Sequence, residues 1–594
     1  MIKLFIGLIF ILIPFLLVIK FRDKSHGFFY VLTGLISFNL IVAILTQTLH
    51  IFNYWTIFSS YIFLNVIIFF VYCKRDKKFI KLKESIQKIK IDWVLFLVII
   101  ILFVSLYSVH YNYTGKIATI NGVEEVANTK INYPYYSDEW GSVSFVKYII
   151  NFNSLPFVNP LWKNHFFVNF EFGFSSFLSS LFVLLGLNPL TNYPIFSLFF
   201  GMLICLLVYF ILRFNHIKKI PAGIASLFIP YIVNSANLPG IWYLIPMTFG
   251  TISLLLGFIF ISLKDEKMIF LTGLLTLIFY PPFFLLSAIS IIFYFISLNI
   301  SIKDKCKFLG IYFSIYFLFV LIFLFILISS QGFAKIFEII LSKIFYFSFT
   351  GNSIPDYSLW KVIPIPILLL SAFGLGYSFF KKKWLSAPLL AGLIYWIAYS
   401  QISWRFVIEY QRIVFFSSII LLIFSGFGMN LLFESLADKR IFRKFHIILF
   451  LEIILLISLT LFSFSYTSRE SWNNLRLPLE SGELISPSPP ASRFLNEDDL
   501  ILFNFTEKIF ISPPWKGLVI GTATGNYPLD TKDANIGVDK LKYSNLISSN
   551  CTSKKQFALD YNIDYVYSSS FDCPNFLFIG KSKENIYLYK FVQN

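Results

Sequence analysis

The chain has 594 residues, of which 57% are hydrophobic and only 14% are charged. Soluble domains carry about 25% charged residues, so this composition excludes an ordinary soluble enzyme. The net charge of +17 does not indicate nucleic-acid binding, because the basic residues cluster in short stretches between apolar runs, the pattern that sets membrane topology. We therefore expect a polytopic helical membrane protein.

Apolar runs recur along the chain, and they predict about fourteen transmembrane helices. In chain order they cover 2–19, 28–50, 54–73, 92–110, 194–212, 220–236, 245–263, 268–280, 283–300, 309–329, 361–380, 385–402, 413–432 and 446–465. Three regions follow from this pattern. Residues 1–91 hold N-terminal helices and a basic loop, residues 92–465 form an all-α transmembrane domain, and residues 466–594 form a soluble tail.

The basic residues orient these helices. The densest basic stretch, 74–90, is expected to be cytoplasmic. Alternate crossing then places the loop 111–193, the loop 403–412 and the whole tail outside, provided that 171–187 does not cross the membrane. That stretch is short and rich in Ser, which favours a juxtamembrane or re-entrant helix. A full crossing there would invert the orientation of every later segment.

The tail differs in composition from the rest of the chain. After a Pro-rich linker at 487–490, short β-like runs appear, and they predict a small α/β or α+β module. The runs are Leu500–Phe503, Leu518–Ile520, Tyr561–Tyr567 and Tyr587–Phe591. Cys551 and Cys573 are the two cysteines of the tail. An outside compartment favours a disulfide between them, with two free thiols as the open alternative.

An acidic pair, Asp138 and Glu139, follows the apolar run 92–110 and lies among aromatic residues that include Tyr136 and Trp140. Acids in an outer loop are often merely solvated. Aromatic neighbours partly exclude water, however, which makes a carboxylate a better base, and their rings suit packing against sugar faces. We therefore interpret 132–141 as a candidate catalytic loop, with Tyr136 and Trp140 as candidate substrate contacts.

Arg405, Glu409 and Arg412 form a second candidate group. Their spacing of four and three places them on one face of a helix. One interpretation is an ordinary ion-paired helix end. The other is a clamp for the phosphate of a lipid donor, in which the two arginines bind phosphate oxygens and Glu409 orients one of them. Weaker candidates for substrate contacts are Lys163, His165 and Glu171.

A transmembrane helix followed by an outer loop with an aromatic-flanked acidic pair resembles the GT-C superfamily of membrane glycosyltransferases. The stretches 162–186 and 221–230 and the phrase Tyr561-Asn-Ile-Asp-Tyr-Val566 are similar to later parts of that pattern. The resemblance implies transfer, with inversion, of a sugar from a polyprenyl phosphate or diphosphate to an acceptor hydroxyl. It also implies that Asp138 is the general base, with Glu139 sharing or replacing that role.

Two departures from this pattern matter. Three apolar helices precede the one that would be first in the superfamily, and the second outer loop, 234–243, contains no acid. An oligosaccharyltransferase places an acid in that loop, so a metal-independent transferase of a monosaccharide fits the sequence better. No cofactor is expected, and a divalent metal is not indicated.

The implied partners are a polyprenyl-phosphate-linked sugar donor, a lipid, glycan or protein acceptor, and membrane lipids, with no nucleic acid. The implied location is the plasma or inner membrane, with the site and the tail outside. Two alternatives remain open. A lipid transporter or flippase predicts ionisable residues within the helices and inverted repeats. A polysaccharide polymerase or ligase would use arginine and histidine of the outer loops instead of the acidic pair.

Overall fold

The computed structural model describes most of the chain and divides it into two compact units. The described residues are 2–21, 26–75, 92–111, 113–119, 122–129, 133–134, 137–162, 169–231, 241, 243–299, 301–331, 337, 363, 365–402, 410–437, 495–531 and 542–593. The first unit combines Met1–Ile80, His110–Phe196 and Ser488–Asn594, and the second combines Lys81–Val109 and Ser197–Pro487. The N-terminal helices, the segment with the acidic pair and the tail thus belong to one unit.

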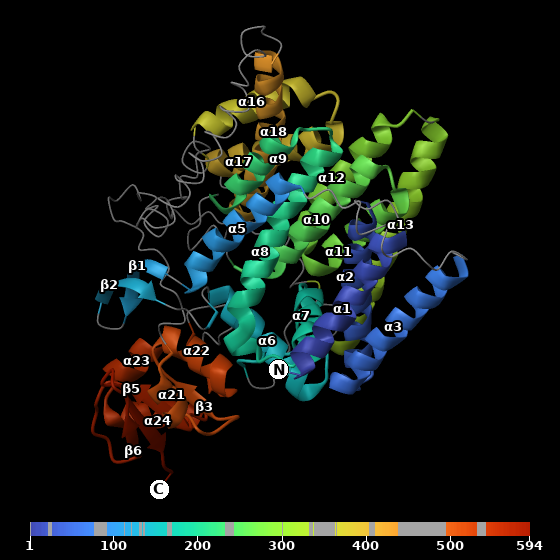
Figure 1. Cartoon of the computed structure of the whole chain (residues 1–594). Coiled ribbons are helices and arrows are strands. Elements are labelled where there is room, and N and C mark those ends of the chain that lie inside the picture. The colour runs from blue at the N-terminus through green and yellow to red at the C-terminus, as the bar shows by residue number, and fades with distance from the viewer. Residues whose placement is uncertain are drawn as a thin grey trace. The chain divides into compact units, whose positions relative to one another are not determined.

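The helical part of the first unit is arranged around a short helix, α7 (Phe172–Leu185). Its neighbours are α1 (Ile2–Phe21), α2 (His26–Thr48), α3 (Tyr54–Arg75) and α6 (Ser137–Phe152) (Figure 1). All residues of α7 except Val183 are buried. Its 14 residues span about 21 Å, less than the roughly 30 Å of a bilayer's hydrocarbon core. Whether 171–187 crosses the membrane stays a prediction about topology.

Buried polar side chains join the N-terminal helices to α7. Asn39 of α2 donates to the backbone oxygen of Phe177 at 3.1 Å. The Asn39 Oδ1 accepts from Tyr61 of α3 at 3.0 Å and from Ser180 of α7 at 2.7 Å. About two turns further along α2, Gln47 bonds to Ser179 and Ser176 of α7. The serines that give α7 its polar composition therefore bind its neighbours, and the three additional helices are integral to this unit.

The second unit is helical and contains α5 (Trp93–Tyr111), most of α8 (Pro189–Phe214), α9 (Lys219–Phe228), α10 (Pro246–Leu263), α11 (Glu266–Phe279), α12 (Pro281–Ser297), α13 (Ile302–Gln331), α16 (Ile365–Ser378), α17 (Lys383–Ile402) and α18 (Tyr410–Ala437), with a 3₁₀ turn at Ile229–Tyr231. At the start of α5, Asp92 accepts from the Tyr209 hydroxyl at 3.0 Å and pairs with Lys219 at 3.2 Å. These contacts join α5, α8 and α9 at one end.

Five described helices are long and apolar enough to cross a membrane: His26–Thr48, Pro189–Phe214, Pro246–Leu263, Ile302–Phe325 and Arg412–Ser435. Eight shorter apolar helices accompany them. The expected runs other than 446–465 each correspond to a described helix, and 446–465 lies outside the described residues. The chain is thus mostly helical as expected, whereas the expected number of crossings stays a prediction.

The tail forms a five-stranded mixed sheet in the order β4-β3-β5-β7-β6. Its strands are β3 (Ile509–Ile511), β4 (Tyr527–Pro528), β5 (Tyr565–Ser568), β6 (Phe576–Lys581) and β7 (Tyr587–Phe591). β3 pairs in parallel with β4 and β5, whereas β7 pairs antiparallel with β5 and β6. Helices α21 (Glu497–Leu502), α22 (Pro514–Thr524), α23 (Tyr543–Ser548) and α24 (Cys551–Asp560) complete the module. A separate hairpin, β1 (Tyr113–Thr119) and β2 (Gly122–Thr129), precedes the acidic pair.

The prediction of a small mixed module is confirmed, but two of its strands were placed wrongly. Tyr587–Phe591 is β7, and the end of Tyr561–Tyr567 belongs to β5. Leu500–Phe503 instead overlaps α21, whose first turn holds three acids after the Asn496 cap. Leu518–Ile520 lies within α22, which begins at a proline and ends at the left-handed Gly525. A short apolar run fits a strand as well as a helix, and here the residues at its two ends favour the helix.

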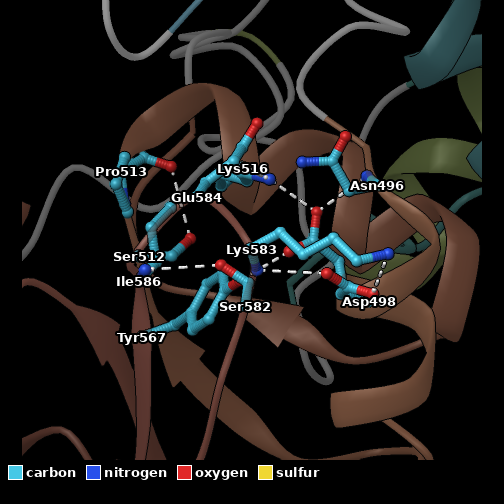
Figure 2. Close-up of polar contacts among 11 residues, drawn as sticks. Asn496, Asp498, Ser512, Pro513, Lys516, Tyr567, Ser582, Lys583, Glu584 and Ile586 are labelled. Atoms are coloured by element: carbon cyan, nitrogen blue, oxygen red, sulfur yellow. Dashed lines mark hydrogen bonds and ion pairs between the residues drawn. The ribbon is translucent and has the colours of Figure 1, made fainter.

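A disulfide and a buried ion pair hold the tail module together. The predicted disulfide between Cys551 and Cys573 is present. A buried ion pair joins Lys516 to Asp499 at 2.5 Å, and the Lys516 Nζ also lies 2.7 Å from Glu584 Oε2 (Figure 2). Burial and the nearby Asp499 charge raise the pKa of Tyr567, so its hydroxyl stays protonated and donates to the same carboxylate.

Candidate active site

The acidic pair begins a helix and does not lie in a loop. The expected catalytic loop 132–141 ends at Ser137, where α6 begins, so Asp138 and Glu139 occupy its first turn. The physical reason is local, because the unpaired N–H groups and the dipole at a helix N-terminus favour negative side chains there. A helix start alone would thus explain two acids at this position. The burial of Glu139 distinguishes the pair from acids that only stabilise a helix N-terminus.

The two carboxylates differ in exposure. Glu139 is fully buried, whereas Asp138 is partly exposed. Among the described residues between Ile2 and Ala437, Glu139 is the only charged residue that is buried. A buried carboxylate is costly to remove from water, so Glu139 and its neighbour Asp138 are candidates for a functional site. Asp138 is the member of the pair that is accessible to solvent.

A buried tyrosine from another helix interacts with this pair. Tyr193, near the start of α8, is fully buried, hydrogen-bonds with the Ser142 side chain, and is close enough to Glu139 and Asp138 to interact with both charges. Ser142 in turn donates to the backbone oxygen of Asp138 at 2.9 Å. Tyr193 was not among the predicted site residues. It immediately precedes the apolar run 194–212, where no local pattern distinguishes it from a core aromatic.

Trp140 has a structural position. Its side chain is fully buried, and its indole N–H donates to the backbone oxygen of Pro134 at 2.8 Å. The Tyr133 ring lies 6.2 Å from it, centroid to centroid. The indole thus fixes the chain just before α6 and is not exposed to solvent. A substrate contact through Trp140 stays a prediction.

The remaining predicted residues divide by what the structure describes. Glu171 is partly exposed and occupies the N-cap position of α7, where its backbone N–H donates to Asn169 Oδ1 at 2.9 Å. Arg412 lies in the first turn of α18. The others, Tyr136, Lys163, His165, Arg405 and Glu409, lie outside the described residues. Substrate contacts and the phosphate clamp therefore stay predictions.

Metal ligands can be assessed only over the described part of the chain. Within it, no group of three or more His, Cys, Asp or Glu side chains could hold a metal ion. The second outer loop, 234–243, in which the sequence shows no acid, is largely outside that part. Metal independence stays a prediction of the sequence.

Known proteins resemble this chain in structure, whereas the comparisons by sequence found no match. No protein-family model and no curated protein matches the sequence. Among solved structures, the chain is similar to the archaeal oligosaccharyltransferase AglB from Archaeoglobus fulgidus in complex with an inhibitory peptide and a dolichol-phosphate, with 14% identity, a TM-score of 0.47, and coverage of 80% of this chain and 69% of that chain.

Two further structures of the Archaeoglobus fulgidus oligosaccharyltransferase match in the same way. The form tethered to an acceptor peptide has 14% identity and a TM-score of 0.45, with 85% of this chain and 74% of that chain covered. The apo form has 13% identity and a TM-score of 0.45, with 81% and 70% covered. Likeness at this level assigns no role to any residue.

Proposed function

We propose that this protein is a membrane glycosyltransferase in which Asp138 is the general base. The observation that supports this most directly is the arrangement at the start of α6. A partly exposed carboxylate follows the start of the helix and a fully buried one comes next in the chain, and the buried Tyr193 interacts with both charges. A helix N-terminus alone does not require a buried acid, whereas a site that accepts a proton does benefit from carboxylates held in a fixed, partly dehydrated position.

In the proposed reaction, Asp138 takes the proton from an acceptor hydroxyl as that oxygen attacks the anomeric carbon of the sugar. The bond from the anomeric carbon to the carrier phosphate breaks in the same displacement, which inverts the configuration. Glu139 is too buried to contact the acceptor. Asp138, which is partly exposed, is therefore the group at which the proton arrives.

The donor is proposed to be a sugar on a polyprenyl phosphate or diphosphate. Arg405 and Arg412 would bind the departing phosphate, and Glu409 would orient one of them. The lipid carrier supplies an activated sugar, so no nucleotide is needed at the site. The proposed orientation places the start of α6 and the tail on the outer face of the plasma or inner membrane, with a lipid, glycan or protein as acceptor.

The deciding experiment compares three single variants in membranes. We expect Asp138→Asn to lower sugar transfer from radiolabelled polyprenyl-phosphate sugars by about 10²–10⁴-fold, the usual contribution of a general base. Glu139→Gln is expected to have a smaller effect. Glu125→Gln is the control, because it changes an acid of the preceding hairpin strand β2, and its transfer rate is expected to match that of the wild type.

Full transfer by inserted, folded Asp138→Asn would overturn the proposed base. If the wild type moves labelled lipid across vesicles but transfers no sugar from any donor of the panel, the transporter alternative replaces the proposal. The panel should contain both monophosphate and diphosphate carriers, because the proposal leaves this choice open.

A further inference from the structure

The tail module is attached to the acidic helix by a lysine. Lys147 of α6 donates from Nζ to the backbone oxygens of Thr522 at 2.8 Å and Ala523 at 2.7 Å. Both oxygens belong to the last turn of α22. The last carbonyls of a helix have no partner within the helix and carry its partial negative charge, so a lysine at this place satisfies two acceptors and the dipole together.

A second contact lies on the same face of α6. The Thr522 hydroxyl is 3.5 Å from the backbone oxygen of Trp140. Trp140 and Lys147 are seven residues apart, which places them one above the other after about two helical turns. The end of α22 therefore lies along one face of α6 (Figure 1), and this contact reaches the first turn, where Asp138 is located.

The other end of α22 is fixed in the tail module. Lys516 is buried in its ion pairs with Asp499 and Glu584 (Figure 2). Gly517 and Gly521 allow close packing, because a Cβ at Gly517 would overlap the Asp530 carbonyl and a Cβ at Gly521 would lie 2.8 Å from Pro528. The helix cannot move independently of the sheet, so Lys147 holds the module as a whole.

We propose that Lys147 is a positioning residue that docks the tail module onto α6 and thereby holds Asp138 in its productive position. The tail is then a part of the active site's support. This inference rests on the proposed function of Asp138. A displacement of about 1 Å at a catalytic group can lower the rate on the order of a hundredfold, and the contact to the Trp140 backbone lies two residues from that carboxylate.

The test uses the full-length protein in nanodiscs with two readouts, hydrogen exchange and steady-state kinetics. We expect Lys147→Met to increase exchange in α6 and in the last turn of α22, while β5 and β7 remain as protected as in the wild type. The kcat is expected to fall at least tenfold, with the donor KM changed less than twofold. Lys147→Arg keeps a cationic donor and is expected to recover most of the kcat.

Lys508→Met is the matched control. It removes a lysine of the same module whose ion pair with Asp564 is 3.5 Å long and about half exposed, and it is expected to leave exchange in α6 and the kcat unchanged. If Lys147→Met does not insert, Lys147→Gln supports the same comparison.

Each outcome decides between the two ideas. Unchanged exchange in α6 and α22 of Lys147→Met overturns the docking role. Increased exchange with an unchanged kcat overturns the positioning role. If Lys147→Met shows increased exchange but Asp138→Asn keeps its activity, the docking contact stands and the proposed base is wrong. That result contradicts the proposed function and not the docking role.

Discussion

The Nζ of Lys516 lies 2.5 Å from Oδ2 of Asp499, and neither side chain is exposed to solvent. The same ammonium faces Glu584, and Tyr567 donates to the second Asp499 oxygen. Replacement of Lys516 by Met leaves the buried Asp499 carboxylate without its cation, next to the partly exposed Glu584. Loss of one partner of a buried pair costs about 3–5 kcal/mol. We expect Lys516→Met to reduce the unfolding free energy of the module by this amount, measured by hydrogen exchange of β5 and β7 in the full-length protein.

Lys583→Met is the control for this prediction. Lys583 pairs with the neighbouring acid Asp498 at 3.4 Å, but its side chain is 86% exposed. Exposed ion pairs contribute about 0–1 kcal/mol, so exchange in β5 and β7 should stay close to that of the wild type. Equal effects of the two substitutions would show that burial of the Lys516 pair does not matter for stability.

The sequence was sufficient to locate the acidic pair and the apolar helices, because both depend on local composition. It was insufficient for the two short runs that became α21 and α22. Their apolar centres fit a strand, and the decisive residues are at their ends, Asn496 before one helix and Gly525 after the other. Greater weight on these end signals would have given the correct structure.

The sequence could not predict the contacts that combine distant segments. Tyr193 approaches Glu139 from another helix, and Lys147 bonds to Thr522, 375 positions further along the chain. No periodicity within a segment carries such information, since only the packing of the helices brings these residues together. The same reasoning applies to Asn39, which the sequence presents as one polar residue within an apolar run.

The docking lysine predicts a pH dependence. Burial lowers the pKa of Lys147 to about 8, whereas a lysine in the unfolded chain titrates near 10.4. Below pH 8 both states are protonated, and the cost of burying the charge is fully present. Between about pH 8 and 10.4 only the unfolded state binds the proton, so stability rises with pH in this window.

We therefore expect the thermal midpoint of the wild type, relative to that of Lys147→Met, to increase between pH 7 and pH 9.5. Other lysines and tyrosines titrate in both proteins, and the difference removes their contribution. A constant difference across this range would contradict the lowered pKa of Lys147.

The polar contacts of Asn39 predict that the N-terminal helices stabilise α7. Asn39→Leu removes its bonds to Phe177, Tyr61 and Ser180 and leaves a buried hydroxyl on α3 and on α7. Interhelical hydrogen bonds in membranes contribute about 0.6–2 kcal/mol each, so we expect a loss of roughly 2 kcal/mol, measured as a lower thermal midpoint in detergent. Thr48→Val is the control, since that exposed hydroxyl bonds within its own helix α2, to the Ile44 oxygen at 2.8 Å.

The crossing of α16 and α18 predicts a strong effect of a single methyl group. A Cβ at Gly374 would overlap the Phe424 carbonyl, and one at Gly428 would overlap the Leu370 carbonyl. The Ser371 hydroxyl also donates across this contact, to the Leu421 oxygen at 2.7 Å. Small residues allow helix backbones to approach in this way. We expect Gly374→Ala to separate the helices and to cost about 1–3 kcal/mol.

Gly376 provides the control on the same helix, because a Cβ there meets no described atom within 4 Å. Alanine is the better helix former by about 1 kcal/mol, so Gly376→Ala should leave the thermal midpoint unchanged or raise it slightly, while Gly374→Ala lowers it. Opposite signs at two glycines only two positions apart would separate the effect of close packing from that of helix propensity. A midpoint of Gly374→Ala at or above the wild-type value would show that the two backbones do not meet at this crossing.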